Sequence, residues 1–184
     1  MKVKVGISNR HIHITEEDYK IIYGKDNLNI RNYLSQPNNF ASEETVTIKT
    51  DKSQIERVRI LGPFRKYTQV EISKTDAIKL GINPPIRTSG DLENSSEVTI
   101  IGPAGSIKKQ CCIIPNRHIH ITEEDYKKYK FDKTCSVKID SIKPTILENV
   151  YFKIGENSVM ELHLDTDDGN ATLLQQKDEV EIIK

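Results

Sequence analysis

The chain has 184 residues, with 27 acidic and 27 basic side chains, so its formal net charge at pH 7 is zero. This balance gives no long-range attraction to nucleic acid or to an anionic membrane, and any binding of phosphate must be local. No apolar run approaches the length of a membrane span, and the first residues read as an alternating strand rather than a signal peptide. We therefore expect a cytoplasmic protein that binds neither nucleic acid nor membrane.

Cysteine usage supports a reducing compartment. Cys111, Cys112 and Cys135 are odd in number, and none forms a Cys-x-x-Cys pattern. Adjacent cysteines do not readily bridge each other, so three free thiols are expected.

The predicted elements are mostly short strands. Val3, Val5 and Ile7 alternate with polar or small residues and predict a first strand, which leads into His11. Thr15 and Thr122 each precede Glu-Glu-Asp, the pattern of a helix N-cap followed by an acidic first turn. The other predicted helices cover 75–80 and 170–176, and further strands are predicted over 46–50, 55–61, 68–73, 98–101, 107–114, 136–140, 146–154, 159–164 and 179–183.

Short strands bounded by Gly, Pro, Asn or Asp favour a mainly β fold of barrels or sandwiches with small capping helices. The segment 83–96 is rich in Pro, Gly, Asn and Ser, and is the expected linker or functional loop.

An internal repeat divides the chain. The twelve residues that start at Asn9, NRHIHITEEDYK, recur unchanged from Asn116, which is 107 positions later. Such identity predicts two related halves of about 90 residues each. We place the first domain at 1–90 and the second at 91–184, with an approximate boundary and with strands free to exchange between the two.

The repeat also carries most of the histidine. In an extended strand, His-Ile-His directs both imidazoles to one face, roughly 6.5–7 Å apart at the backbone, whereas on a helix they would diverge by about 200°. This spacing favours metal binding by His11 with His13 and by His118 with His120. His163 is expected to join the second pair. The alternative is that these histidines are hydrogen-bonded structural residues.

A second group of candidate residues surrounds Arg65. Alternation over 68–73 places Gln69 and Glu71 on one face of a strand, so an amide and a carboxylate could share a cavity. Arg65 precedes them on a turn, where a planar guanidinium could hold phosphate in a bidentate grip. The alternative is an ordinary surface arginine, and the polar runs 87–90 and 165–170 are equally typical of solvated loops.

At these residues the chain resembles the phosphate propanoyltransferases, the phosphotransacylases of propanediol-utilisation type. Five motifs in the family's order carry the resemblance: SNRHIH at 8–13, LGPFRKYTQVEIS at 61–73, PIRTSGD at 85–91, RHIH at 117–120 and HLDTDDGNA at 163–171.

The resemblance implies two β-barrel-like domains with the active site between them, and a dinuclear zinc site with two Zn²⁺ per chain. It implies transfer of a short acyl group between coenzyme A and inorganic phosphate, so the partners would be acyl-CoA, CoA, phosphate and acyl phosphate. Arg65 corresponds to the family's phosphate-binding arginine, and Gln69, Ser89 and Asn170 to other polar positions near the active site. The implied metal-binding residues are His11, His13, Glu71, His118, His120 and His163.

Two features depart from the family's pattern. Where the family often has Asp-Glu-Ala-Asn, this chain has Asp-Asp-Gly-Asn at 167–170, which removes no proposed ligand. Members targeted to microcompartments carry an extra N-terminal helical segment, whereas here a strand is expected from Lys2, so we expect no such targeting. The sequence is compatible with a homodimer but does not determine the oligomeric state.

No Ser-His-Asp arrangement or activated cysteine is evident, which favours direct acyl transfer over a covalent acyl-enzyme. Two other classes remain compatible with the residues: a zinc-dependent hydrolase of a small ester or amide, and a non-catalytic double barrel clamped by metal ions.

Overall fold

The computed structural model describes residues 1–183. It divides into two compact units, which are described separately. Unit 1 contains Met1–Asn9 and the chain from Asn116 onward, and unit 2 contains Arg10–Pro115.

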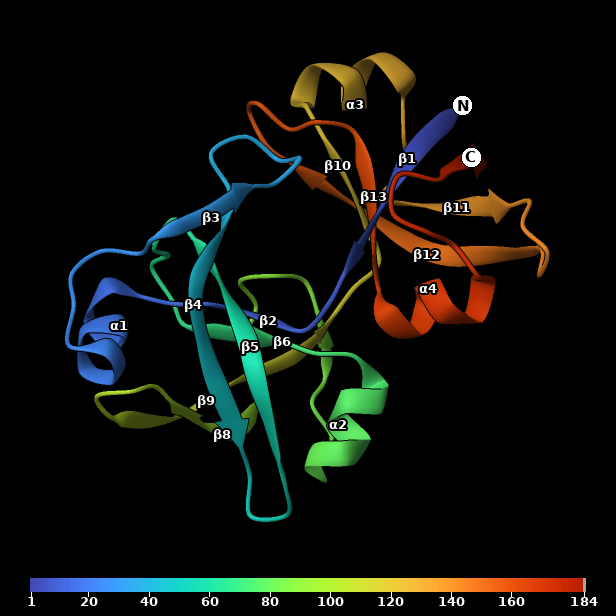
Figure 1. Cartoon of the computed structure of the whole chain (residues 1–184). Coiled ribbons are helices and arrows are strands. Elements are labelled where there is room, and N and C mark those ends of the chain that lie inside the picture. The colour runs from blue at the N-terminus through green and yellow to red at the C-terminus, as the bar shows by residue number, and fades with distance from the viewer. Residues whose placement is uncertain (184) are drawn as a thin grey trace. The chain divides into compact units, whose positions relative to one another are not determined.

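Unit 1 is a closed barrel (Figure 1). Its strands follow one another around the barrel in the order β1 (Lys2–Ser8), β13 (Glu161–Asp165), β10 (His118–Ile121), β12 (Thr145–Ile154), β11 (Thr134–Ile139) and β14 (Glu179–Ile183). Two short helices accompany it, α3 (Glu123–Tyr129) and α4 (Thr166–Thr172).

Unit 2 closes in a similar way. Its ring consists of β4 (Phe40–Lys49), β5 (Gln54–Gly62), β2 (His11–His13), β6 (Gln69–Glu71), β9 (Ser106–Pro115) and β8 (Ser96–Ile101), because β8 pairs with both β9 and β4. Added to this ring are the strands β3 (Ile30–Tyr33) and β7 (Ile86–Arg87) and the helices α1 (Glu16–Tyr23) and α2 (Lys74–Leu80). The predicted mainly β fold with two barrels and short helices is confirmed.

Each barrel has its own apolar core, and the middle isoleucine of each His-Ile-His motif belongs to it. Ile12 packs in the core of unit 2 and Ile119 in the core of unit 1, both fully buried. Because side chains alternate along a strand, the flanking histidines project from the outer wall of each barrel. Burying the isoleucine therefore fixes the direction of the histidines.

Side-chain caps set the helix starts. Thr15 accepts a hydrogen bond from the Asp18 amide, and Thr122 accepts one from the Asp125 amide, which confirms both predicted N-caps. The helix predicted over 170–176 instead covers 166–172, because the Asp165 side chain accepts the amides of the first turn.

The division into units differs from the expected boundary at residue 90, which falls inside unit 2. The first strand pairs with β13 in parallel and with β14 antiparallel, so it belongs to unit 1 rather than to the N-terminal repeat. The chain passes from one unit to the other between residues 9 and 10 and between residues 115 and 116, just before each His-Ile-His motif. Segment 83–96 therefore lies within unit 2 and does not link the units.

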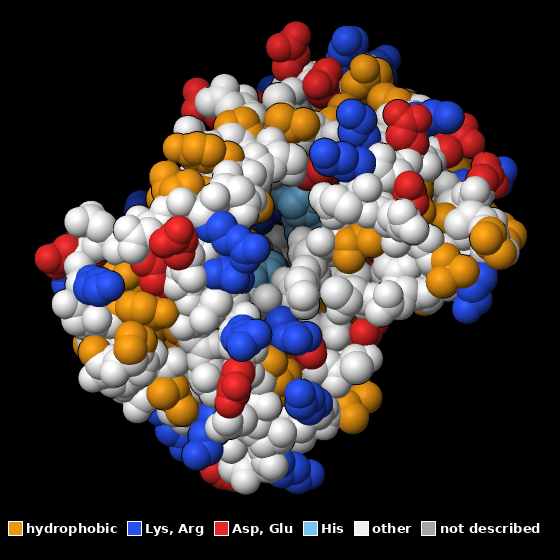
Figure 2. Space-filling model, viewed as in Figure 1, with side chains coloured by type: hydrophobic (Ala, Val, Ile, Leu, Met, Phe, Trp, Pro, Cys, Tyr) orange, Lys and Arg blue, Asp and Glu red, His pale blue; other side chains and the backbone are white. Residues whose placement is uncertain are grey.

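The distribution of charged side chains on the surface agrees with the equal numbers of acidic and basic residues in the sequence. Figure 2 shows basic and acidic side chains interspersed over the visible face. Within residues 1–183, none of the helices has both the length and the apolar character needed to cross a membrane.

Candidate functional site

The first cluster of potential metal ligands lies in unit 2. Antiparallel pairing of β2 with β6 places His11 opposite Glu71 and His13 opposite Gln69. The Nε2 atom of His11 lies 3.4 Å from Oε2 of Glu71, and the Nε2 atom of His13 lies 3.9 Å from Oε1 of the same carboxylate. The potential ligand atoms of His11, His13 and Glu71 all lie within 4.8 Å of one another. We call these three residues the first metal group.

The second cluster lies in unit 1. Pairing of β10 with β13 places His118 opposite His163, and the ligand atoms of His118, His120 and His163 also lie within 4.8 Å of one another. All three side chains are partly exposed. We call them the second metal group. The prediction that His163 joins the second pair agrees with this geometry.

The donor atoms of the second metal group suit zinc. His118 Nδ1 lies 2.8 Å from the main-chain oxygen of Asn116, so this nitrogen carries the hydrogen and Nε2 keeps its lone pair. The Nε2 atoms of His118 and His120 are 3.3 Å apart. Two nitrogen ligands at 2.0–2.1 Å from a tetrahedral zinc ion are separated by roughly 3.3 Å. The arrangement therefore fits the expected metal.

The two metal groups occupy equivalent positions in their barrels. Glu71 and His163 each lie opposite the first histidine of a His-Ile-His strand. Gln69 and Glu161, two residues earlier, each lie opposite the second histidine. The structural repeat thus extends to strands β6 and β13, whose sequences do not reveal it.

A hydrogen-bond network connects Gln69, Glu71 and Ser89. Fully buried Gln69 donates through Nε2 to Oε1 of Glu71 at 2.5 Å and to Oγ of Ser89 at 2.9 Å. Its Oε1 accepts from the Gly90 amide at 2.8 Å. With both ends of the amide occupied, Gln69 holds the Glu71 carboxylate in one orientation. The structure thus brings together three residues that were predicted to act at one site.

The main chain of Arg65 is hydrogen-bonded to the segment that carries His11 and His13. Its amide donates to the main-chain oxygen of Ile14, the residue after His13, at 2.9 Å. Its Nη2 donates to Oδ1 of Asn39 at 2.8 Å. Its Nε is buried and has no hydrogen-bond partner within the described part of the chain. The guanidinium is therefore oriented by one contact while a second donor stays available for an anion.

Comparison with known proteins decides the family. The family model described as phosphate propanoyltransferase matches residues 4–175. The chain belongs to the phosphate propanoyltransferase family.

Individual relatives match over nearly the whole chain. A phosphate propanoyltransferase of Thermotoga maritima is 43% identical over 185 residues, covering 98% of this chain and 88% of the relative. One of Priestia megaterium is 46% identical over 180 residues, covering 96% and 83%. One of Levilactobacillus brevis is 39% identical over 173 residues, covering 92% and 83%. The predicted family is confirmed, and the chain is an enzyme of the phosphate acyltransferase class.

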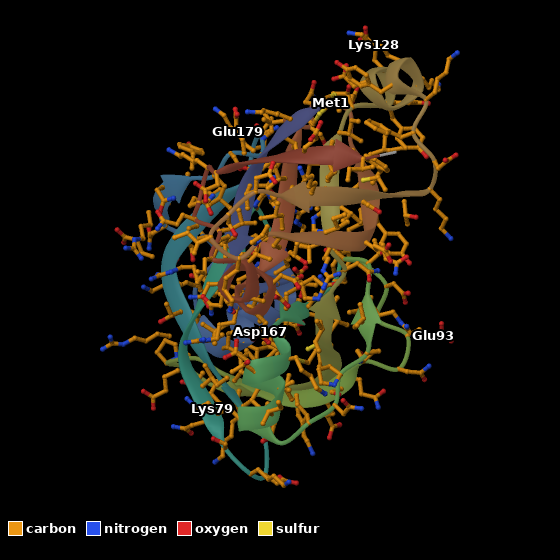
Figure 3. All side chains as sticks on the ribbon, turned by 90° about the vertical axis from the view of Figure 1, so that its right-hand side faces the viewer. Met1, Lys79, Glu93, Lys128, Asp167 and Glu179 are labelled. Carbon is orange, nitrogen blue, oxygen red and sulfur yellow. The ribbon has the colours of Figure 1, made fainter. Side chains whose placement is uncertain are left out.

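Asn170, the last of the residues implied by the family resemblance, lies in α4 of unit 1. Its side chain is exposed, and its main-chain oxygen accepts a hydrogen bond from the Leu173 amide. Figure 3 labels Asp167 on the same helix. Asn170 thus follows the strand that carries His163, and its role stays a prediction.

Two arginine–aspartate pairs of this protein were not predicted from its sequence. Arg10 Nη1 lies 3.1 Å from Oδ1 of Asp76, and Arg117 makes two hydrogen bonds to Asp168. Each arginine directly precedes a histidine of a metal group, and each aspartate lies in the first turn of a helix. The hydrogen bonds to Asp168 raise the pKa of Arg117. The repeated Asn-Arg-His sequence was the signal that could have pointed to them.

The cysteines are buried and free, as expected. Burial raises the pKa of Cys111 to about 12 and that of Cys135 to about 11. The pKa of Cys112 is raised for the same reason. Thiols in such surroundings are poor nucleophiles near neutral pH.

Proposed function

We propose that the protein transfers a short acyl group between coenzyme A and inorganic phosphate, in the reaction acyl-CoA + phosphate = acyl phosphate + CoA. Membership of the phosphate propanoyltransferase family supports this reaction. The observation that carries the proposal is the pair of equivalent metal groups, each with ligand atoms within 4.8 Å of one another.

We propose that each metal group binds one zinc ion. His11, His13 and Glu71 would hold one ion, and His118, His120 and His163 the other. Three protein ligands leave a coordination position open, as in catalytic zinc sites. When bound, zinc supplies Lewis-acid polarisation and positive charge, which favours the meeting of two anionic substrates. Both ions serve the same reaction in this proposal, as the family resemblance implies.

Arg65 binds and orients the phosphate. Its available Nε donor, beside an Nη2 fixed by Asn39, can pair with phosphate oxygens in a charge-assisted contact. Arginine suits this task because its planar fork matches the spacing of two phosphate oxygens. Holding phosphate beside the thioester replaces an encounter in solution by a reaction within one complex.

Gln69 and Ser89 act as positioning residues for Glu71. The Gln69 amide donates to both Glu71 and Ser89, and its own oxygen is fixed by the Gly90 amide. This orientation keeps the Glu71 carboxylate directed at the two histidines of its group. We assign Asn170 a polar contact with substrate, which its exposure on α4 permits.

We propose direct transfer in a complex that holds both substrates. A phosphate oxygen attacks the thioester carbonyl carbon, the carbon–sulfur bond breaks, and the sulfur leaves as the CoA thiolate, which takes up a proton from solvent. The new carbon–oxygen bond makes acyl phosphate. Buried cysteines with raised pKa values give no support to an acyl-enzyme formed on sulfur.

The testing experiment follows two products from one mixture of propanoyl-CoA and phosphate. Free CoA is measured with a thiol reagent, and acyl phosphate is trapped with hydroxylamine. The proposal predicts equal amounts of both and no CoA release when phosphate is omitted. Release of CoA without phosphate, with free acid as product, would show a hydrolase instead. A series of acyl-CoA lengths in the same assay gives the preferred acyl group.

A further inference from the structure

The two metal groups differ at one pair of positions. Glu71 in unit 2 corresponds to His163 in unit 1, and amide-bearing Gln69 corresponds to carboxylate-bearing Glu161. At these two strand positions each barrel therefore carries a carboxylate, but at a different register position. In unit 2 it is itself a member of the metal group. In unit 1 it lies opposite His120 on the neighbouring strand and contacts His163.

Glu161 is in direct contact with His163. It is 5% exposed, and its Oε2 lies 2.7 Å from Nε2 of His163. A carboxylate accepts hydrogen bonds, so Nε2 of the neutral ring carries the hydrogen. The lone pair of a neutral imidazole then resides on Nδ1. Histidines that bind metal ions usually donate their other ring N–H to a carboxylate or carbonyl group in this way.

A glycine makes room for this arrangement. Gly6 on β1 is in register with His163, and a methyl group at Gly6 would lie 3.0 Å from Cδ2 and 3.1 Å from Nε2 of that ring. The corresponding neighbour of Glu71 in unit 2 is the buried side chain of Ile113. The larger ligand, histidine, thus stands beside glycine in unit 1, and the smaller ligand, glutamate, stands beside isoleucine in unit 2.

The same contacts orient the ring. Its Cδ2–Nε2 edge lies over Gly6 and toward Glu161. Nδ1 lies on the opposite edge of an imidazole. The ring centroid of His163 is 4.5 Å from that of His120 and 5.3 Å from that of His118.

We propose that Glu161 is a positioning residue of the second metal group: it accepts the Nε2–H of His163 and presents the Nδ1 lone pair to an ion shared with His118 and His120. Gly6 leaves the space that this ring orientation requires. The inference rests on the proposed function, because it assumes that the second group binds metal.

The test isolates the second metal group. The variant H11A/H13A lacks two ligands of the first group, so it should bind one Zn²⁺ per chain. The affinity of that ion is measured by competition with a chromophoric chelator. Introducing Glu161→Gln into the H11A/H13A variant should weaken Zn²⁺ binding about 10- to 100-fold, which is the usual effect of removing the hydrogen-bond partner of a metal ligand. Gly6→Ala, a second and independent change, should weaken it as well, and keeps the test decisive if Glu161→Gln does not fold. Glu181→Gln, an exposed change in the same barrel, is the matched control and should have no effect.

A spectroscopic readout separates positioning from general stability. Long-range ¹H–¹⁵N spectra of the zinc-loaded protein report which nitrogen of each histidine binds the ion. The proposal predicts Nδ1 for His163, and Nε2 ligation would overturn it. Unchanged affinity in Glu161→Gln, with one ion still bound in H11A/H13A, would overturn the role of Glu161 alone. An H11A/H13A protein that binds no ion would overturn the metal assignment of the second group, and this inference with it.

Discussion

Arg117 and Asp168 are joined by two parallel hydrogen bonds, from Nε to Oδ2 at 2.7 Å and from Nη2 to Oδ1 at 2.8 Å. Arg117 directly precedes His118, and Asp168 lies in the first turn of the helix that follows the His163 strand. The pair therefore ties together the two segments that supply the second metal group. In unit 2, Arg10 and Asp76 make the corresponding contact.

Arg117→Lys should lower the melting temperature of the metal-free protein. Lysine cannot reproduce the two parallel contacts. Because the Arg117 and Asp168 side chains are 36% and 20% exposed, water screens the pair. We expect a loss of about 1 kcal/mol, which corresponds to roughly 2–4 °C for a chain of this size. The change in melting temperature is measured by calorimetry of Arg117→Lys, Asp168→Asn and the double variant. The double variant should be less destabilised than the sum of the two, whereas simple additivity would show that the residues do not act as a pair.

Arg65→Ala should raise the KM for phosphate and lower turnover, with the melting temperature nearly unchanged. The change removes a charge-assisted contact to the reacting anion. Arg65→Lys should restore only part of the activity, because an ammonium group cannot grip two oxygens in one plane. Steady-state rates with phosphate varied provide the measurement. Unaltered phosphate kinetics, or a protein that unfolds, would remove Arg65 from the phosphate site.

Thiol reagents should modify the native protein slowly and leave its activity intact. Because the pKa of Cys135 is about 11, only about one Cys135 side chain in a thousand is ionised to the thiolate at pH 8. Burial protects Cys111 and Cys112 further. Mass spectrometry after iodoacetamide treatment should find little labelling at pH 8 and three labelled cysteines in denaturant. Fast labelling together with loss of transfer would instead favour a reaction through sulfur.

Replacing His11 and His13 by alanine should abolish acyl transfer although His118, His120 and His163 remain. The remaining ion would lack the second positive charge that offsets repulsion between two anionic substrates. Circular dichroism confirms the fold, and the coupled CoA and acyl phosphate assay gives the rate. Transfer at a near wild-type rate would mean that the two repeats work separately.

Local features of the fold were predictable because local chemistry determines them. Thr15 and Thr122 stand before acidic turns and act as N-caps, as expected. Ile12 and Ile119 alternate with histidines, so burial of the isoleucines directs the imidazoles outward. The two histidine pairs were predictable because they recur at strand spacing, whereas Glu71 was assigned to its group through the family resemblance.

Pairings between distant segments were not predictable from one sequence. Lys4 pairs with Glu161, which places the first strand in the unit of the C-terminal repeat. No local pattern encodes such a partner. The correspondence of Gln69 with Glu161 was not detectable in the sequence, because strands β6 and β13 pair with their His-Ile-His strands in the same register but have different residues. The run 165–170 was equally compatible with a solvated loop, and its composition did not reveal that the Asp165 carboxylate caps α4.

The metal content of the purified, active enzyme tests the central claim most directly. Elemental analysis after exhaustive dialysis should find about two equivalents of divalent metal per chain, predominantly zinc, since two groups of three ligands are present. Removal by a chelator should abolish transfer and lower the melting temperature, and added Zn²⁺ should restore both. A preparation that transfers the acyl group at full rate with less than about half an equivalent of metal would contradict the account.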